Sequence, residues 1–415
     1  MDNEELKDRD HKKLGKELDL FTFSDVVGKG LPLWTPKGSV IKRILERWVV
    51  DEEINDGYQH VSTPDLAKLD LYRKSGHYPY YKDSMYAPIQ IDDEEFMLRP
   101  MSCPHHFELY LSRPRSYKEL PVRFAEIAKL YRYEKSGELM GLQRVRSFCL
   151  ADAHIIARPD QVKSEINKVL DLIEKMAKVL GLVPQEDYWY RLSLGDRKDT
   201  KKYFKDDTAW DHAEKILREV LKERKGEFVE APAEAAFYGP KIDIQMKNVN
   251  GKEDTAFTVQ YDFVFPKRFN LNYINEGGKE DQAVVIHRSS IGAIERVIAY
   301  LIEKYAGAFP VWLSPIQVKI LPITDKNRKY AERVEKKLKE EGIRVEVDDR
   351  NETLQAKIRD AQLKKIPYMI ILGEKEESAK KVSVRPREGK DLGQMDLEKF
   401  LSLVKDKVDQ KSLDL

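Results

Sequence analysis

The chain has 415 residues but only two cysteines, Cys103 and Cys149. Two cysteines cannot form the network of disulfides that holds many small secreted domains together. No stretch approaches the roughly 20 consecutive apolar residues that a membrane-crossing helix requires. The N-terminal segment is rich in charge and lacks the apolar core of a signal peptide. We therefore expect a soluble, cytoplasmic protein without a membrane partner.

The chain also lacks an excess of charge of one sign. Charged residues make up 35% of the sequence, yet 73 Lys and Arg residues nearly balance 72 Asp and Glu residues, and the net charge is +1. This balance excludes a uniform attraction to nucleic acid, so an RNA partner would have to bind local basic patches. The length exceeds that of one ordinary domain and predicts two or three.

The most informative segment covers residues 123–154, RFAEIAKLYRYEKSGELMGLQRVRSFCLADAH. Two strand-like runs flank a loop, and Arg132 and Arg144 stand at its two ends. The planar fork of arginine matches phosphate oxygens, while Glu134 offers a hydrogen-bond acceptor and Phe148 a ring that could stack on a base. These groups suit a nucleoside triphosphate site, although composition alone equally permits a β-hairpin with a charged surface loop.

Periodic patterns predict regular elements before residue 307. Ser39 is expected to cap a helix with an apolar face from Val40 to Trp48, and the segment YQHVSTP that follows is expected to be a short strand ended by Pro64. The clearest helix covers residues 159–181, with an apolar stripe at helical spacing. Further strands are expected at 242–246 and 257–264, separated by the turn signal NVNG.

A domain boundary is expected near residues 307–316, where small residues and prolines are concentrated. Beyond it, strands and helices alternate, which is typical of a mostly parallel sheet covered by helices. The expected strands are 318–323, 343–347 and 368–372, and the expected helices are 326–341, 353–365 and 396–408.

Several segments resemble the class II aminoacyl-tRNA synthetases. The run RYE…RVRSF…DAHI resembles their second signature motif, in the form found in the threonyl-specific branch. The other similar segments occur in the family's order over almost the whole chain: RDHKKLGKELDLF (9–21), LRPMSCPHH (98–106), FYGPKIDI (237–244), IHRSSIGAIERVIAYLIE (286–303) and VEVDDRNETLQAKIRDAQLKKIPYMIILGEKE (345–376).

The resemblance implies two domains and their partners. An α+β catalytic domain built on an antiparallel sheet would cover residues 1–308. A smaller α/β anticodon-binding domain with a mostly parallel sheet would cover residues 315–415. The partners would be ATP, L-threonine and tRNA(Thr), and the helix and strand near residues 39–64 resemble the first class II motif, which implies a homodimer. Relatives carry an N-terminal and an editing domain before the segment at Arg9, so we expect a form without them and without editing in cis.

The resemblance assigns five residues to ATP, which would bind with Mg²⁺. Arg132 would hold the α-phosphate and the amino acid carboxylate. Glu134 would receive the adenine amino group, Phe148 would stack on the ring, and Arg144 and Arg296 would hold the γ-phosphate. Arg132 and Arg296 are the expected catalytic residues, because adenylate formation brings two anions together and requires fixed positive charge. From the residues alone, Arg296 would be a salt-bridged or solvated residue beside an apolar helix face.

The resemblance also implies one zinc ion per chain, bound by Cys103, His154 and His287 with one coordination position open. From the residues alone, their wide spacing identifies no metal site, and rival ligands stay open: His105, His106 and Cys149. The metal would take the amino group and β-hydroxyl of threonine.

Three further residues are expected to bind threonine. Asp152 would accept a hydrogen bond from the β-hydroxyl, and Tyr238 and Gln260 would complete the pocket. Valine lacks the hydroxyl and leaves these groups unpaired, which costs about 1–3 kcal/mol for each group. Serine loses only a methyl group, worth about 1 kcal/mol, so we expect it to be activated as well.

The sequence departs from the family at a few positions near this pocket. Leu150 and Ala151 replace a common Gln and Asp, Ser102 replaces a common Asn, and Thr255 stands where a Gln is frequent. The sequence does not decide between an intact pocket and one that these changes weaken or alter. A binding paralogue without catalysis is the rival interpretation, and another class II specificity, such as serine or proline, is a third.

In the C-terminal domain, Asn351, Glu376 and Arg385 match the positions at which the family reads anticodon bases. Proteins that recognise RNA sequence usually bind unstacked loop bases through their Watson–Crick edges. Without the resemblance, the surrounding charge would be interpreted as an ordinary solvated surface.

Overall fold

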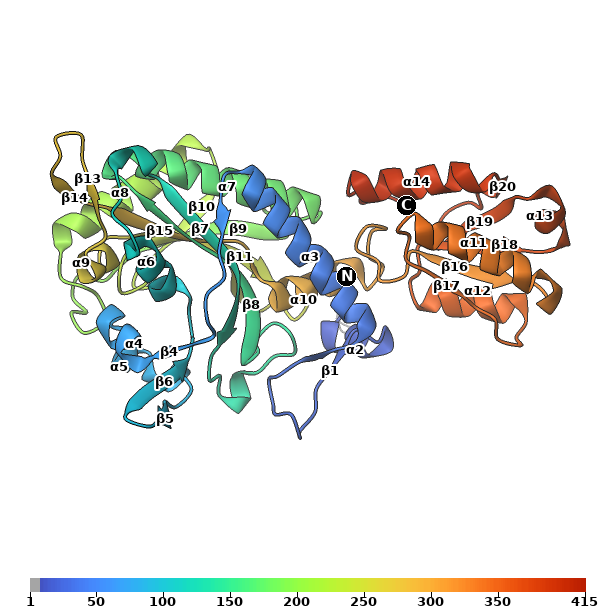
Figure 1. The fold of residues 1–415 in the computed structure, drawn as a ribbon, viewed down its shortest axis with the longest axis horizontal. Helices are drawn as coiled ribbons and strands as arrows, with labels where there is room; N and C mark the ends of the chain where they lie inside the picture. The colour runs from blue at the N-terminus through green and yellow to red at the C-terminus, as the bar shows by residue number, and fades with distance from the viewer. Residues whose placement is uncertain (1–7) are drawn as a thin grey trace.

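The computed structural model describes residues 8–415, which form two units lying side by side (Figure 1). Each unit has its own β-sheet and its own buried core. The connection between them contains no regular element from residue 306 to residue 317. No helix among residues 8–415 is long and apolar enough to cross a membrane.

The first unit is built on an eight-stranded sheet in the order β10-β9-β11-β12-β15-β8-β7-β3. The central strands are antiparallel, as predicted, but the pairs β10–β9 and β3–β7 at the two edges are parallel. The sheet is therefore mixed, with an antiparallel centre. Its strands are β3 (Gln59–His60), β7 (Val122–Tyr131), β8 (Ser147–Ala157), β9 (Tyr188–Ser193), β10 (Phe228–Ala231), β11 (Lys241–Lys247), β12 (Glu253–Asp262) and β15 (Val284–Ala293).

Long helices pack against this sheet and form the main core with it. The predicted helix at 159–181 is confirmed as a short 3₁₀ turn followed by α7 (Val162–Val179), and its apolar stripe is fully buried. The helix predicted to begin at Ser39 begins earlier. In α3 (Pro36–Asn55), Thr35 is the cap and its Oγ1 accepts a hydrogen bond from the Gly38 amide at 3.2 Å. Proline at the first helical position fits this start, because its missing N–H would be unpaired there anyway.

Smaller elements complete the first unit. They are α2 (His11–Glu17), β1 (Phe21–Thr22), β2 (Leu33–Trp34), β4 (Leu66–Lys68), α4 (Leu69–Ser75), α5 (His77–Tyr80), β5 (Ile89–Ile91), β6 (Glu94–Leu98), α6 (Cys103–Leu111), α8 (Asp207–Glu223), α9 (Phe265–Phe269), β13 (Asn272–Ile274), β14 (Glu280–Gln282) and α10 (Ile294–Tyr305).

The second unit has a five-stranded sheet, with its strands in the order β17 (Val345–Val347), β16 (Val318–Pro322), β18 (Tyr368–Leu372), β19 (Val382–Pro386) and β20 (Gly393–Met395). The prediction of a mostly parallel sheet is confirmed only in part, because the sheet is mixed. The strands β17, β16 and β18 are mutually parallel, but β19 and β20 join them antiparallel. The sequence analysis missed β19, β20 and the short helix α13 (Glu374–Ala379), which links β18 to β19. Parallel strands need a longer crossover, so this short link favours an antiparallel pair.

The predicted alternation of strands and helices before β19 is confirmed. The elements of the second unit are β16 (Val318–Pro322), α11 (Arg328–Glu340), β17 (Val345–Val347), α12 (Leu354–Leu363), β18 (Tyr368–Leu372), β19 (Val382–Pro386), β20 (Gly393–Met395) and α14 (Leu397–Asp409).

Two arginines of the second unit bind the connecting segment. Arg344 donates to the carbonyl oxygens of Ser314 and Trp312 at 2.9 and 2.8 Å. Arg387 donates to those of Ala308 and Phe309, both at 2.7 Å. The connection is thus hydrogen-bonded to the second unit and is not a free linker. The boundaries at residues 308 and 315 stay a prediction.

A buried ion pair joins α3 to the centre of the sheet. The Arg288 guanidinium on β15 donates to Glu53 Oε1 on α3 at 2.6 Å, and both side chains have no exposed surface. The same oxygen accepts from Ser290 Oγ at 2.7 Å, and His60 lies 2.8 Å from the other oxygen. Burial raises the pKa of Glu53, but the charge of Arg288 and these hydrogen bonds outweigh it and hold the pKa below its usual range. The carboxylate is therefore charged.

We expect Glu53→Gln to lower the free energy of unfolding by about 3–5 kcal/mol, because it leaves the Arg288 charge buried without a counter-charge. Glu52→Gln on the same helix is the control. Glu52 pairs with Lys175 near the surface, and such pairs contribute at most about 1 kcal/mol. Urea unfolding followed by circular dichroism measures both. Equal losses for the two variants would contradict a special role for the buried pair.

Candidate active site and metal centre

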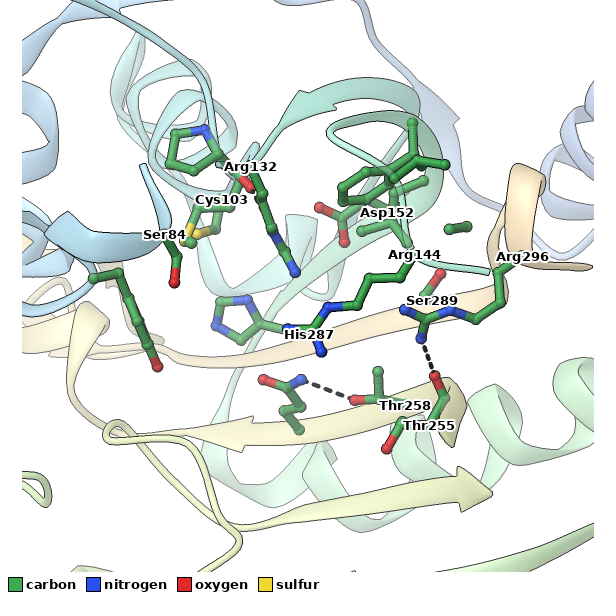
Figure 2. A pocket seen from close by; sticks show the side chains of 18 of the residues that line it. Ser84, Cys103, Arg132, Arg144, Asp152, Thr255, Thr258, His287, Ser289 and Arg296 are labelled. Carbon is green, nitrogen blue, oxygen red and sulfur yellow. Dashed lines mark hydrogen bonds between the residues drawn. The ribbon is translucent and has the colours of Figure 1, made fainter. Parts of the chain in front are cut away.

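A cavity of about 490 Å³ lies over the middle of the eight-stranded sheet, above β8, β12 and β15 (Figure 2). Every residue predicted to bind ATP, threonine or zinc lines it: Cys103, Arg132, Glu134, Arg144, Phe148, Asp152, His154, Tyr238, Gln260, His287 and Arg296. Their functional roles stay predictions, but the fold gathers them around one space.

The alternation of β8 explains how one strand serves both the cavity and the core. Successive side chains of a strand point to opposite faces of the sheet. Phe148, Asp152 and His154 therefore face the cavity. The apolar core beneath the sheet contains Cys149, Ala151, Ala153, Ile155 and Ala157. This placement removes Cys149 from the candidate metal ligands.

Three arginines extend into the cavity from different elements (Figure 2). Arg132 follows β7, donates to the Pro100 carbonyl at 3.2 Å, and its guanidinium lies 5.2 Å from the centre of the Phe148 ring. Burial lowers the pKa of Arg132, but an arginine remains charged throughout the physiological range. Arg296, at the start of α10, donates to the backbone carbonyls of Gln143 and Thr255. It is thus a residue of the cavity wall.

The third arginine, Arg144, already has an acidic partner. Its Nε lies 2.7 Å from Glu134 Oε2, and its Nη2 lies 3.6 Å from Glu138. The sequence analysis predicted that Glu134 binds the adenine amino group of ATP and that Arg144 binds the γ-phosphate. In the structure they pair with each other, so a bound nucleotide would have to exchange this contact for its own.

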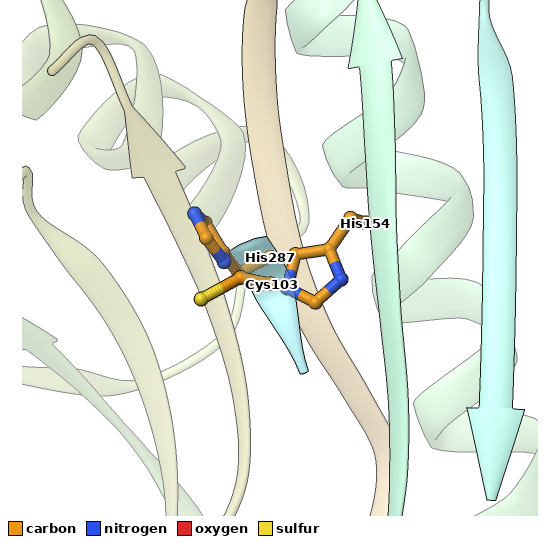
Figure 3. A group of neighbouring side chains, drawn as sticks. All are labelled: Cys103, His154 and His287. Carbon is orange, nitrogen blue, oxygen red and sulfur yellow. The ribbon is translucent and has the colours of Figure 1, made fainter. Parts of the chain in front are cut away.

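The candidate metal centre consists of Cys103, His154 and His287 (Figure 3). One ligand atom of each lies within 4.8 Å of the others, and all three residues are buried. The two histidines are direct partners in the register of β8 and β15, and their rings lie 4.7 Å apart. Cys103 comes from the first residue of α6. The rival candidates His105 and His106 lie outside this group.

The donor set fits zinc. A thiolate and two imidazoles are zinc ligands in tetrahedral sites, and three protein ligands leave the fourth position open. Burial raises the pKa of the Cys103 thiol well above its usual value and lowers the pKa of His154 well below its usual value. A neutral imidazole is ready to bind a cation, and a bound cation favours the thiolate form of the cysteine.

The residues predicted for threonine surround this centre. Ser102 Oγ donates a hydrogen bond to Asp152 Oδ2, and burial raises the pKa of Asp152. Tyr238 donates its hydroxyl to Gln260 Oε1, and its ring lies 5.0 Å from that of His287. These polar groups line a space next to the Cys/His/His group.

Of the two polar groups lost on β8, only one affects the cavity. Leu150 lines it, whereas Ala151 is fully buried in the core beneath the sheet. Thr255 lines the cavity near Arg296, and its Oγ1 accepts a hydrogen bond from Gln245 at 2.6 Å. Leu150 and Thr255 are therefore the departures that line the cavity, and Ser102 contacts it through Asp152.

The sequence analysis missed His77, which also lines the cavity. Its Nδ1 lies 2.7 Å from Ser75 Oγ, and its Nε2 lies 4.0 Å from Cys103 Sγ. Burial lowers the pKa of His77 to about 3, so the ring is neutral. No spacing pattern pointed to it, because a single histidine in a short helix carries no periodic signal.

The residues predicted to read an anticodon lie in the second unit. Asn351 follows β17 and Glu376 follows β18, so both lie beyond the carboxyl ends of parallel strands, at the same edge of the sheet. Glu376 accepts hydrogen bonds from the Gly373 amide and from Ser383 Oγ. Arg385 is two residues after Ser383 on β19 and shares its face.

Comparisons with known proteins agree with this architecture. The family described as tRNA synthetase class II core domain (G, H, P, S and T) matches residues 86–305, and an anticodon binding domain matches residues 317–407. The chain is 51% identical, over 98% of its length, to a threonine–tRNA ligase of Geobacillus kaustophilus, and 50% identical over 96% to one of Listeria monocytogenes. It spans 62% of the length of each.

Solved structures show the same similarity over nearly whole chains. A structure described as the RNA binding domain of threonyl-tRNA synthetase from Cryptosporidium parvum has a TM-score of 0.90 and 34% identity, covering 96% of this chain and 98% of that one. A putative threonyl-tRNA synthetase from Aeropyrum pernix has a TM-score of 0.85 and 29% identity, covering 97% and 96%. The chain therefore belongs to the class II aminoacyl-tRNA synthetases, in their threonyl-tRNA synthetase branch.

Proposed function

We propose that the chain is a threonine–tRNA ligase. It would form threonyl-adenylate from L-threonine and ATP with Mg²⁺, and then transfer the threonyl group to tRNA(Thr). The observation that carries the proposal is the single cavity that gathers Arg132, Arg144 and Arg296 beside the Cys103–His154–His287 group. The family membership and the similarity to named threonine–tRNA ligases support it.

The arginines would do the chemical work of the first step. The threonine carboxylate attacks the α-phosphorus of ATP, and pyrophosphate leaves. Arg132 would contact both anions, while Arg144 and Arg296 would hold the leaving phosphates in line. Glu134 would receive the adenine amino group, and Phe148 would stack on the base. Fixed charges that need not reorganise during the reaction stabilise the transition state in this way. The mechanism requires no side-chain nucleophile.

Cys103, His154 and His287 would hold one zinc ion, which supplies a Lewis-acidic position for the amino group and hydroxyl of threonine when bound. Asp152 would accept the hydrogen bond of that hydroxyl, and Ser102 would orient the carboxylate by donating to Oδ2. Tyr238 and Gln260 would close the pocket. A site with buried polar groups rejects valine strongly, because these groups stay unpaired. Serine offers the same hydroxyl and is rejected weakly.

The second unit would bind the anticodon through Asn351, Glu376 and Arg385. A homodimer is part of the proposal, since the segment before α3 exposes apolar residues: Phe23, Val26, Val27 and Leu33. Exposed apolar patches frequently mark protein interfaces.

Amino-acid-dependent exchange between ATP and pyrophosphate tests the first step. We expect strong exchange with threonine, weaker exchange with serine, and none above background with valine. Metal analysis of the same sample should find one zinc per chain. Equal exchange with valine would contradict selection by the hydroxyl, and a folded protein without any exchange would favour a binding paralogue.

We expect Arg296→Ala to reduce the exchange rate with threonine by about 10²–10³-fold, the usual effect of removing one preorganised charge donor. Lys304→Ala is the control, because Lys304 lies on the same helix but pairs with Asp187 outside the cavity. Steady-state exchange assays and thermal unfolding measure both variants. Unchanged exchange in Arg296→Ala would remove this arginine from the proposed mechanism.

We expect Arg385→Ala to raise the KM for tRNA about tenfold, equivalent to about 1.4 kcal/mol, while exchange without tRNA stays unchanged. The control is Arg333→Ala on α11, which removes an exposed arginine of the same unit. Aminoacylation and exchange assays separate the two steps. A collapse of the exchange reaction in Arg385→Ala would contradict the division of labour between the units.

A further inference from the structure

Each histidine of the candidate metal centre has one ring nitrogen bound to a group that is not itself a candidate ligand. His287 Nε2 lies 2.8 Å from Asp262 Oδ2. His154 Nδ1 lies 2.8 Å from His106 Nδ1. The two contacts use opposite ring nitrogens. Only the remaining nitrogen of each ring is free to bind a metal, so the partners of these rings determine how the ligands are presented.

Asp262 acts on His287 as a fixed hydrogen-bond acceptor. Its side chain is fully buried at the end of β12. Its Oδ1 accepts hydrogen bonds from the amides of Val264 and Phe265 at 2.8 and 3.0 Å. The two amides occupy Oδ1, and the other oxygen, Oδ2, accepts a hydrogen bond from His287, which therefore carries its proton on Nε2. The lone pair of His287 is then on Nδ1.

His154 is also held by a second series of hydrogen bonds, which runs through His106 to Glu126. His106 is fully buried, and its Nε2 lies 3.2 Å from Glu126 Oε2. Glu126 is held by Thr63, whose amide and hydroxyl donate at 3.0 and 2.8 Å, and by the Arg99 guanidinium. Burial raises the pKa of Glu126, but these donors outweigh it and hold the pKa at about 2.

The proton positions on His106 and His154 follow from the ionised carboxylate of Glu126. A neutral His106 donates Nε2–H to Glu126 and therefore has a lone pair on Nδ1. That lone pair accepts a hydrogen bond from His154 Nδ1–H. His154 is left with its lone pair on Nε2.

We propose that Asp262 and the His106–Glu126 pair are positioning residues that fix opposite tautomers of the two histidine ligands. His287 would bind zinc through Nδ1 and His154 through Nε2, with ring orientations set before the metal enters. The inference rests on the zinc site of the proposed function and extends it to residues that do not touch the metal. Partners of this kind typically change metal affinity by 10–100-fold when they are removed.

Adjacent histidines on α6 provide a matched test. His106→Leu removes the partner of His154, whereas His105→Leu removes a buried histidine whose two ring nitrogens have no hydrogen-bond partner among the described residues. Zinc dissociation constants are measured by competition with a chelator on the purified chain. We expect His106→Leu to weaken zinc binding by 10–100-fold and His105→Leu to leave it within about twofold. Cys103→Ala removes a candidate ligand and serves as the reference for complete loss of zinc binding.

Asp262→Asn provides an independent test on another strand. An amide at position 262 can donate to His287 Nε2, which moves the ring proton to Nδ1 and blocks the nitrogen that should bind zinc. We expect a 10–100-fold loss of zinc affinity. Asp243→Asn on β11 is the control, because Asp243 is equally buried but accepts from Arg191 and Ser193. Asp243→Asn therefore measures how the loss of a buried carboxylate affects stability when no candidate zinc ligand is involved.

The tautomers can also be observed directly. Nitrogen-15 NMR of histidine-labelled, zinc-free protein should show His154 protonated on Nδ1 and His287 protonated on Nε2. The opposite tautomers, or unchanged zinc affinity in both His106→Leu and Asp262→Asn, would overturn the inference while leaving a zinc-binding ligase in place. A wild-type chain that binds no zinc would overturn both this inference and the zinc part of the proposed function.

Discussion

The antiparallel pairing of β8 with β15 is the constraint on which the site depends. It places His154 directly opposite His287, and the two-residue period of β8 divides its side chains between cavity and core. A shift of one residue in this register would turn Asp152 and His154 into the apolar core and turn Ala151 and Ala153 toward the cavity. The apolar residues on the lower face therefore hold the polar residues of the upper face in place, because only one register buries them.

The three arginines that extend into the cavity have different partners. Arg132 and Arg296 donate to backbone carbonyls, which satisfy hydrogen bonds without cancelling the positive charge. Arg144 lies 2.7 Å from the carboxylate of Glu134, and Arg296 lies 3.5 Å from that of Asp254. A buried charge without a counter-charge costs free energy, and an anionic ligand would recover part of it. The arrangement is consistent with a site whose stabilising partner is the substrate.

Away from the cavity, buried carboxylates are paired or hydrogen-bonded and give rigidity to the site. Glu53 ties α3 to Arg288, the residue after His287. Glu126 lies 3.2 Å from His106, and Asp262 lies 2.8 Å from His287 of the candidate metal centre. Ionised carboxylates accept hydrogen bonds and cannot donate them, so each one sets the orientation of its neighbours. In the second unit, Arg344 and Arg387 hold the connecting segment in a similar manner, through backbone carbonyls.

Much of this protein was determined by the sequence itself. The apolar stripe of α7 predicted its burial, the segment around Arg132 predicted two strands, and the similar segments predicted the family. The tertiary structure alone decided the rest. The start of α3 at Pro36, the antiparallel strand β19 and the place of His77 depend on local capping, on a short connection and on packing. The grouping of Cys103, His154 and His287, and the carboxylates behind the histidines, depend on strand register, because residues distant in sequence become neighbours only when the sheet forms.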